Sequence, residues 1–261
     1  MALRNPKDIR FSLEIPELKK TISYRALKVG EQKTLLTVLE LKDARAIINA
    51  IVDIVGAITF GELDLSKTPM HLVDYIFLKS FIKSSGARSQ AEYTCGGTIE
   101  VEEISKDADG NDLPPEKKTV PCGSQHQLLL NLENAQVKYP EGYTPSKLIK
   151  IDDTMSIKIR LPDFESFRNL DMDKDVIEIS DQYIFAGIEY ILDGEDMKVP
   201  GVDFSFEEMT TWLNELPSPV LDEISKFFDD VPVLTLNVDV TCPKCGRKDG
   251  FELQGLDDFF L

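Results

Sequence analysis

Residues 233–253 read VLTLNVDVTCPKCGRKDGFEL, and this stretch guides the interpretation of the rest of the chain. Its first eight residues alternate between apolar and polar side chains, a pattern typical of a half-buried strand. Cys242 and Cys245 then stand three positions apart on a tight turn that ends at Gly246, so both thiolates can point at one cation. Because Phe251 to Leu253 can return beside the first strand, the stretch predicts the hairpin of a zinc ribbon.

A structural zinc ion takes four ligands, and the only other cysteines are Cys95 and Cys122. A hairpin turn is predicted at residues 107–112, almost midway between them, by the Asp109-Gly110 pair. Facing residues of an antiparallel pair are equidistant from the turn, so the hairpin is expected to bring these two cysteines together at its open end. We therefore predict one zinc site with four ligands, Cys95, Cys122, Cys242 and Cys245.

Three other roles of the cysteines stay open at this stage. All four can be inert thiols, Cys242 and Cys245 can form a redox pair, and a disulfide can join Cys95 to Cys122. A redox pair normally stands at a helix N-terminus, which lowers the thiol pKa, whereas a Gly-Arg-Lys-Asp-Gly run follows here. A disulfide requires an oxidising compartment. Residues 1–20 contain no unbroken apolar segment of a secretory signal, so the chain is expected to stay in a reducing cytoplasm.

The composition describes a folded, strongly acidic protein. Hydrophobic residues make up 42% of the chain, enough to bury a sizeable core, and the formal net charge is −17. A polyanion repels the phosphates of nucleic acids and anionic membranes, so neither is an expected partner. The longest apolar segment, residues 44–60, is interrupted by Arg45, Asn49 and Asp53 and falls short of the ~20 apolar residues of a membrane span.

Local patterns in the first half predict strands and a helical hairpin. An alternating strand ends at Pro16, and residues 27–41 fit either a short helix or a strand. Asp43 is expected to cap one helix. A second helix is expected to have Thr68 as its N-cap and Pro69 at its first position, and to end at Gly86. Three further strands are predicted at residues 98–104, 117–120 and 155–160.

The second half is predicted to be mainly helical. Apolar residues from Val176 to Tyr190 share one helix face, and Asp193-Gly194 is expected to end that helix. Ser205 and Glu208 form a capping box for a helix to about Leu216. Another helix is predicted between Ser218-Pro219 and Pro232.

The predicted fold class is therefore α+β, with helical segments, antiparallel β-hairpins and a zinc-ribbon-like site that joins the central hairpin to the C-terminal knuckle. Four regions are expected. They are an N-terminal strand with a helical hairpin (1–90), a central β region (91–162), a helical region (163–232) and a C-terminal knuckle hairpin with an apolar tail (233–261).

No catalytic motif is present: the chain lacks a nucleophile elbow, a P-loop, a GxGxxG turn and an HExxH helix. Its two histidines are His71 and His126. His71 is interpreted as a surface or core residue, and His126 either has no role at the metal site or donates a hydrogen bond to a cysteine ligand. Alternating carboxylates at 107–111 and 171–175 fit caps and turns better than a calcium loop. The prediction is a protein that is not an enzyme and has no small-molecule substrate.

The layout resembles that of the baseplate hub proteins of T-even-type contractile-tailed phages. The resemblance covers most of the chain and lies in the segment Val29-Gly-Glu-Gln-Lys-Thr-Leu-Leu36, the helix from Ile47 to Ile58, and the run Asp74-Tyr-Ile-Phe-Leu-Lys79 followed by Ser84-Ser-Gly86. It also lies in the Cys-Pro-Lys-Cys-Gly end and in Gly255-Leu-Asp-Asp-Phe-Phe260. The widely split pair Cys95 and Cys122 departs from the closer spacing expected in relatives.

The resemblance implies a structural or assembly role in a tail baseplate, with other baseplate or tail proteins as partners. It implies a location in the host cytoplasm during assembly and then in the virion tail. An alternative is a zinc-ribbon regulator that contacts nucleic acid or a polymerase, which Arg247 and Lys248 at the knuckle tip favour and the net charge opposes. A third is a metal-dependent hydrolase.

The C-terminus ends in large apolar residues, although chain ends are usually polar and frayed. Phe259, Phe260 and Leu261 follow two carboxylates. One reading is that this tail folds back over the ribbon and completes its core. The other is that the tail binds a groove on a neighbouring baseplate subunit, where buried aromatic residues commonly act as anchors.

Overall fold

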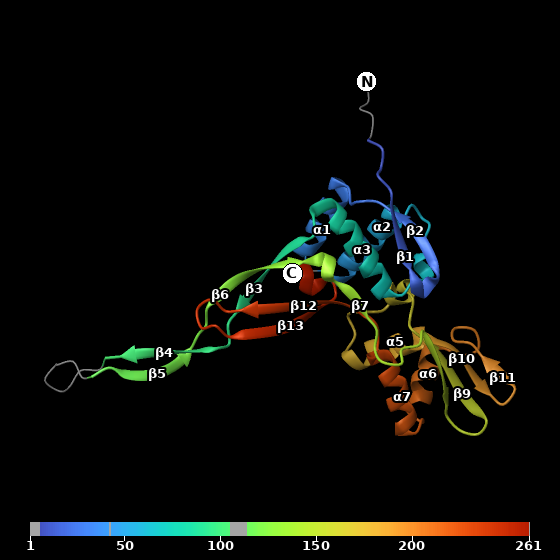
Figure 1. Ribbon diagram of the computed structural model, residues 1–261. Coiled ribbons are helices and arrows are strands. Elements are labelled where there is room, and N and C mark those ends of the chain that lie inside the picture. Colours follow the sequence, from blue (N-terminus) through green and yellow to red (C-terminus); the bar gives the residue numbers. More distant parts are fainter. Residues whose placement is uncertain (1–5, 42, 105–113, 261) are drawn as a thin grey trace. The chain divides into compact units, whose positions relative to one another are not determined.

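The computed structural model describes residues 6–41, 43–104 and 114–260 and contains both helices and antiparallel sheets (Figure 1). The predicted α+β class is confirmed. The chain divides into two compact units, each assembled from segments that are distant in sequence. Unit 1 comprises Met1–Gly86 and Val137–Leu234, and unit 2 comprises Ala87–Gln136 and Thr235–Leu261.

Unit 1 begins with a β-hairpin. Strands β1 (Phe11–Ile15) and β2 (Lys20–Tyr24) pair antiparallel, and the 3-10 helix η1 (Pro16–Leu18) connects them. Pro16 ends the first strand, as predicted. Ile15 and Ile22 are each 1% exposed, so one face of the hairpin belongs to the core.

Three helices follow: α1 (Val29–Leu41), α2 (Ala44–Ile58) and α3 (Met70–Ser85), and α2 packs against both neighbours. The ambiguous residues 27–41 are thus mainly helical. The Asp43 carboxylate accepts a hydrogen bond from the Ala46 backbone amide at 3.1 Å, which confirms the predicted cap. Gly86 ends α3 with a φ of 87°, a conformation that glycine adopts without steric cost.

The predicted N-cap of α3 is wrong. Pro69 occupies the cap position and no side chain caps this helix. Thr68 instead ends the 3-10 helix η2 (Leu65–Lys67), and its hydroxyl donates to the Asp64 carbonyl at 2.8 Å. The sequence rule failed because a second, shorter helix immediately upstream uses the threonine hydroxyl.

The rest of unit 1 is an antiparallel sheet covered by helices (Figure 1). The strand order is β11-β10-β9-β8. The strands are β8 (Ser146–Lys150), β9 (Met155–Arg160), β10 (Ile188–Asp193) and β11 (Asp196–Lys198). The helices are α4 (Phe164–Arg168), α5 (Val176–Gly187), α6 (Phe206–Leu213) and α7 (Ser218–Asp229). The predicted strand at 155–160, the helix between Ser218 and Pro232, and the capping box of α6 are confirmed.

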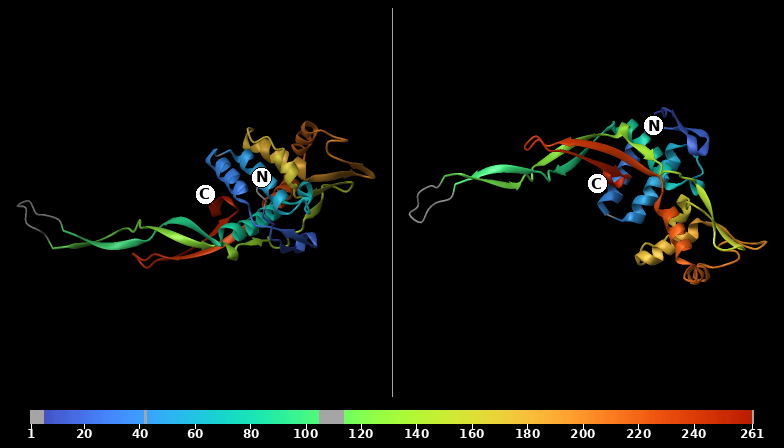
Figure 2. Two further views of the ribbon diagram at one scale, coloured as in Figure 1. Left: turned by 90° about the horizontal axis from the view of Figure 1, so that it is seen from above. Right: turned by 60° about the horizontal axis from the view of Figure 1, so that its bottom comes forward.

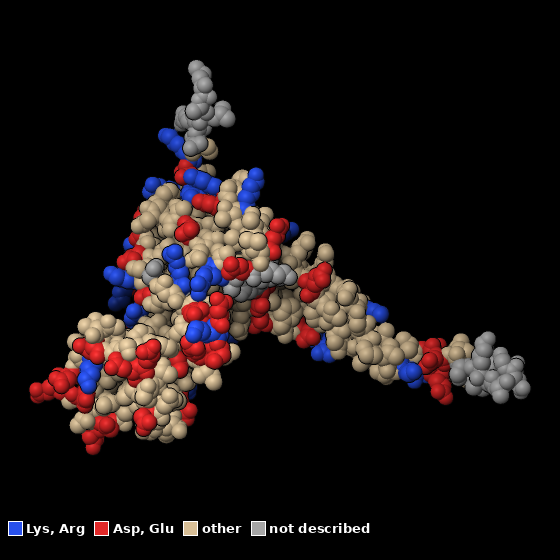
Figure 3. Space-filling view, turned by 180° about the vertical axis from the view of Figure 1, so that it is seen from behind, with Lys and Arg blue, Asp and Glu red and all other residues tan. Residues whose placement is uncertain are grey.

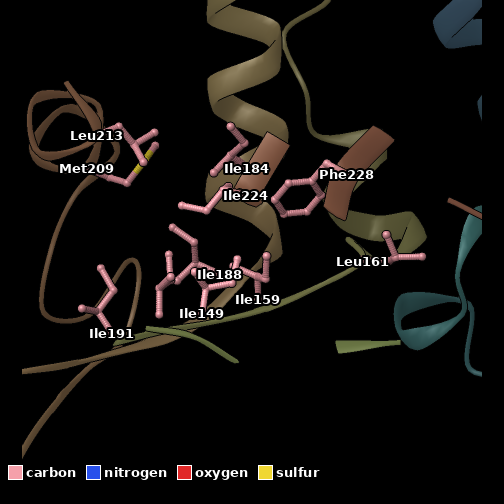
Figure 4. Close-up of a cluster of buried hydrophobic side chains, with 11 residues drawn as sticks. Ile149, Ile159, Leu161, Ile184, Ile188, Ile191, Met209, Leu213, Ile224 and Phe228 are labelled. Carbon is pink, nitrogen blue, oxygen red and sulfur yellow. The ribbon is translucent and has the colours of Figure 1, made fainter. Parts of the chain in front are cut away.

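The core of this part lies between the sheet and helices α5, α6 and α7 (Figure 4). Ile157 and Ile159 of β9 are both fully buried, as their alternation predicts. They meet Ile184 of α5, Met209 of α6 and Ile224 of α7. Each such side chain contributes about 1.5–3 kcal/mol by leaving water, so this cluster fixes the helices on the sheet.

The predicted helix from Val176 through Tyr190 is confirmed as far as Gly187 and is wrong beyond that residue. Helix α5 ends at Gly187, and Tyr190 lies on strand β10, which pairs with β9. A Cβ at position 187 would lie 2.5 Å from the Phe228 ring. Any larger residue would clash there, so this position requires glycine. Gly194 forms the β10–β11 turn instead. The sheet hydrogen bonds override the helical periodicity. Helix α6 also ends earlier than expected, at Leu213.

Unit 2 is built from β-ribbons. Strands β3 (Arg88–Thr94) and β6 (Gln125–Asn131) form one antiparallel ladder, and β4 (Thr98–Glu103) and β5 (Glu116–Pro121) form the next (Figure 2). These strands confirm the predicted central hairpin, whose turn at 107–112 lies outside the described residues. Further elements of unit 2 are η3 (Leu132–Asn134), most of β12 (Val233–Thr241), β13 (Lys248–Gln254) and α8 (Asp257–Phe260), whereas β7 (Gln136–Lys138) lies at the boundary of the unit. Strands β12 and β13 pair antiparallel.

Candidate metal centre

The central ribbon holds Cys95 and Cys122 at the break between its two ladders. Cys95 follows β3 and Cys122 follows β5. The Cys95 amide donates to the Ser124 carbonyl at 2.9 Å, and the Cys122 amide donates to the Gly97 carbonyl at 2.8 Å. The two cysteines are therefore diagonal neighbours rather than opposite each other.

The predicted position of this pair within the hairpin needs a correction. Cys95 and Cys122 were expected at the open end, but the ladder continues beyond them as β3 and β6 as far as Arg88 opposite Asn131. The position of the predicted hairpin turn correctly indicated that the two cysteines approach each other. It did not give the correct register of the strands. Sequence offered no signal for the second ladder, because strands β3 and β6 are largely polar and have only one buried residue, Leu130.

The C-terminal cysteines lie on the turn between β12 and β13. Thr241 faces Lys248 at the end of this ladder, and the Cys242 amide donates to the Arg247 carbonyl at 2.8 Å. The Gly246 amide donates back to the Cys242 carbonyl at 2.8 Å, and Gly246 has a φ of 72°. The strand, the tight turn and the returning strand are all as predicted.

The break between the ribbon ladders and the β12–β13 turn bring all four sulfurs together. The four Sγ atoms lie within 4.8 Å of one another. Cys95 Sγ is 3.5 Å from Cys245 Sγ, and Cys122 Sγ is 3.8 Å from Cys242 Sγ. A tetrahedral zinc with Zn–S bonds of about 2.3 Å separates its sulfurs by about 3.8 Å. The donor set and its spacing therefore fit a four-thiolate zinc site.

The cysteines are unoxidised and mostly buried. None of the four forms a disulfide. Cys95, Cys122 and Cys242 are 2%, 4% and 0% exposed, and Cys245 is half-buried. Tyr93 and Ile99 pack against them. A metal here would have no open coordination position toward solvent, which is the character of a structural site rather than a catalytic one.

Hydrogen bonds aimed at the sulfurs favour thiolates. Burial alone would raise the pKa of Cys242, but the Cys245 amide, the His126 ring and the Lys244 amide outweigh it and lower this pKa to about 6. His126 Nε2 lies 3.4 Å from Cys242 Sγ. The Gly97 amide donates to Cys95 Sγ at 3.3 Å. Such donors orient metal-bound thiolates and stabilise their charge.

The pKa of the Cys245 thiol is shifted in the opposite direction, upwards. The Arg247 amide lowers the pKa of Cys245, but burial and the sulfurs of Cys95, Cys242 and Cys122 outweigh it and raise this pKa to about 12. Four close thiols cannot all ionise without a cation to balance them. The cluster thus requires either retained protons or a positive ion.

Side chains at the knuckle connect the β12–β13 turn to the central ribbon. Arg247 donates to the Gly96 carbonyl at 3.0 Å and forms an ion pair with Asp249 at 3.4 Å. The Lys244 ammonium donates to the Cys122 carbonyl at 3.3 Å. Tyr93 donates to Asp249 and stacks on Phe251 at 6.0 Å. The sequence analysis missed these contacts, because nothing local links residue 93 to residue 251.

The C-terminal tail packs on unit 2 itself. Leu256 is 7% and Phe259 1% exposed, and the Ser89 hydroxyl donates to the Phe259 carbonyl at 3.0 Å. Phe259 therefore contributes to the core of its own unit. The side chain of Phe260 and all of Leu261 lie outside the described part of the chain, so their predicted contact with a partner stays a prediction.

A second polar cluster, in unit 1, also escaped the sequence analysis. His71 is buried, and its Nε2 lies 2.8 Å from Glu17 Oε2. The Tyr139 and Tyr143 hydroxyls donate to the same carboxylate at 3.1 and 3.0 Å. Burial raises the pKa of Glu17, but His71 and both tyrosines outweigh it and hold this pKa below its usual value. The cluster joins three distant segments, which is a structural role.

Of three comparisons of the chain with known proteins, one matched a protein family and two found no match. A family model described as T4 bacteriophage base plate protein matches residues 7–261, nearly the whole chain. No curated protein and no solved structure matches the chain. Within the described residues, no helix is long and apolar enough to cross a membrane. The family match and the four-sulfur geometry are the two findings from which a function can be argued.

Proposed function

The chain belongs to the T4 bacteriophage base plate protein family, and we propose that it is a non-enzymatic structural or assembly component of the baseplate hub, stabilised by a structural zinc ion. The observation that carries the baseplate role is the match over residues 7–261, because it spans both compact units. Family membership supports other tail or baseplate proteins as partners and a place in the virion tail.

Zinc is the metal that the donor set favours. Four thiolates are soft ligands, and a tetrahedral set of them suits zinc or an iron–sulfur centre rather than calcium or magnesium. The single ion position enclosed by four sulfurs within 4.8 Å leaves no room for a multi-iron cluster. In this proposal the zinc joins the central ribbon to the C-terminal hairpin and performs no chemistry on a substrate.

The alternative of a zinc ribbon that contacts nucleic acid receives less support. Arg247, one of the two basic residues that favoured it, is engaged with the Gly96 carbonyl and with Asp249 inside the chain. Phosphate binding would require that arginine to leave both partners. The net charge of −17 further weakens attraction to a polyanion.

The test uses tagged protein recovered from infected cells. We expect co-purification of other baseplate proteins and about one zinc per chain by elemental analysis. The Cys95→Ser, Cys122→Ser double variant should lose the zinc, whereas Ser124→Ala, a matched change beside the cluster, should keep it. Recovery without any baseplate protein would refute the baseplate role, and stoichiometric zinc in the double variant would refute the four-cysteine site.

A further inference from the structure

A pocket of about 310 Å³ in unit 1 is lined by residues of helix α6, of the loop before it and of strands β9, β10 and β11. Its apolar lining consists of Met155, Ile191, Phe204, Met209 and Trp212. Ile191 and Met209 also belong to the hydrophobic core, at whose edge they lie (Figure 4). The volume is at the small end of the roughly 300–1,000 Å³ typical of ligand pockets, so it suits one long side chain rather than a helix.

Trp212 gives this pocket an aromatic wall. It is the only tryptophan of the chain, and it is half-buried in the structure. The indole ring attracts a cation over its face more strongly than the rings of Tyr and Phe do. The chain uses such a contact elsewhere, where the Arg10 guanidinium lies 4.0 Å from the centre of the Phe60 ring. The wall is therefore suited to the head group of a cation.

The polar lining of the pocket has an excess of negative charge. It consists of Asp193, Lys198, Asp203 and Glu208. The Lys198 ammonium pairs with the Asp193 carboxylate at 3.4 Å, so these two charges offset each other. The other two carboxylates accept backbone hydrogen bonds instead, Asp203 from the Val199 amide and Glu208 from the Ser205 amide, both at 2.8 Å. Neither of them forms an ion pair within the described part of the chain, so two negative charges at the pocket lack a cation.

The surroundings of the pocket strengthen its attraction for cations. The amide and the hydroxyl of Ser205 hold the pKa of Glu208 below its usual value, so this carboxylate is ionised at neutral pH. Residues 163–232 contain 19 acidic and 4 basic residues. Figure 3 shows carboxylates crowded over the part of unit 1 that carries α6, β10 and β11. A field of this sign draws cations toward the pocket and repels anions.

A guanidinium group meets these requirements better than an ammonium group does. It is planar, it stacks on aromatic faces, and its fork of N–H groups can donate to carboxylates on more than one side. The aliphatic part of an arginine side chain also covers apolar surface while its charged end stays at a polar rim. A second copy of the chain is a poorer source of this group, because a net charge of −17 on each copy opposes their association.

We propose that this pocket receives an arginine side chain of another baseplate protein, with the guanidinium beside Asp203 and Glu208 and the aliphatic stem against Trp212. The proposal rests on the proposed baseplate role and names the chemistry of one contact through which that role is exercised. Arginine is among the residues that most often anchor protein interfaces, because one side chain combines apolar contact with charge-assisted hydrogen bonds.

Because Trp212 is the only tryptophan, its fluorescence reports on this pocket alone. The full chain is titrated with three Gly/Ser peptides that differ only in a central arginine, lysine or citrulline, the neutral isostere of arginine. The test variant is Asp203→Asn with Glu208→Gln, which removes both charges while an amide oxygen can still accept each backbone hydrogen bond. The control is Asp196→Asn with Glu207→Gln, which removes the same charge from exposed residues that do not line the pocket. Thermal unfolding verifies that each variant is folded.

We expect the arginine peptide to change the fluorescence saturably, the lysine peptide to bind more weakly, and the citrulline peptide not to bind. The test variant should bind the arginine peptide at least about tenfold more weakly, with the control unchanged, because hydrogen bonds to charged groups are lost. The absence of a saturable change would overturn the proposal. Lysine or citrulline binding as tight as that of arginine would also overturn it, as would equal losses in both variants.

Capture from infected cells tests the partner. The unaltered chain and the control should recover the same baseplate proteins, and the test variant should lose one of them. Equal recovery by all three would overturn the proposal and leave the baseplate role intact. If the unaltered chain binds the arginine peptide but recovers no baseplate protein, the baseplate role fails. Light scattering that shows self-association of the unaltered chain but not of the test variant would assign the pocket to a second copy, against the proposal.

Discussion

The sulfur of Cys242 lies 3.8 Å from that of Cys122, although 120 positions separate the two residues. Cys122 lies at the break between the two ladders of the central ribbon and Cys242 lies on the turn between β12 and β13, so the contact joins the ribbon to the C-terminal hairpin within unit 2. A metal ion at this contact closes a long loop of chain. Such a closure restricts the unfolded chain far more than the folded one and therefore favours folding.

Removal of zinc is expected to destabilise unit 2. Binding of structural zinc contributes directly to the free energy of folding, so chelation should lower the corresponding melting temperature by at least about 10 °C. Differential scanning calorimetry before and after chelation measures this shift. Zinc added back should restore the transition and magnesium should not. An unchanged melting curve in protein shown to be zinc-free would contradict the prediction.

Gly97→Ala is expected to damage the metal centre. A Cβ at this position would lie 2.9 Å from Cys245 Sγ and 3.1 Å from the Arg247 side chain, closer than van der Waals contact permits. Displacement of a sulfur should reduce zinc affinity by roughly 10–100-fold, the usual effect of disturbing the surroundings of a ligand. Competition with a chromogenic chelator measures the affinity.

Gly96→Ala provides the matched control for that substitution. A Cβ on Gly96 meets no atom within 4 Å, so the same chemical change one residue earlier should leave zinc affinity near that of the unaltered chain. Equal losses in both variants would mean that backbone freedom, rather than the space beside Cys245, is what the glycines provide.

Phe259→Ala tests the role of the C-terminal tail. Phe259 is 1% exposed, and truncation of a buried phenylalanine typically costs about 3 kcal/mol or more. Urea unfolding should therefore show a clear loss of stability, with Asp258→Asn as an exposed neighbour for comparison. If stability is kept while capture of baseplate proteins is lost, the tail serves a partner instead. Deletion of residues 257–261 would then have the same outcome.

Glu17→Gln is expected to change how stability depends on pH. Because the pKa of Glu17 is lowered in the folded chain, its carboxylate adds stability above its unfolded pKa, and this stability is lost as pH falls through the folded pKa. The free energy of unfolding of the unaltered chain should exceed that of the variant by about 1–2 kcal/mol at neutral pH, and the difference should shrink as pH falls through the folded pKa of Glu17. Urea unfolding across this range measures it. Exposed Glu14→Gln should show no such trend.

Local chemistry explains which elements could be predicted. The Asp43 cap, the Ser205 capping box and the turn at Gly246 depend on a few neighbouring residues, so the sequence contains all the information they need. Thr68 shows the limit of such rules, because its hydroxyl had two possible partners and local pattern could not choose between them.

Residue patterns were enough to predict the α+β class, the C-terminal knuckle and the four cysteines that meet. The tertiary structure alone decided the diagonal register of Cys95 and Cys122, the end of α5 at Gly187, and the burial of Phe259. It also assembled His71, Tyr139 and Tyr143 around Glu17. The difference lies in the sequence distance over which the interactions act. Helix capping and strand alternation depend on a few neighbouring residues. Register, burial and shared ligands depend on hydrogen bonds and packing between segments that meet only in the folded chain.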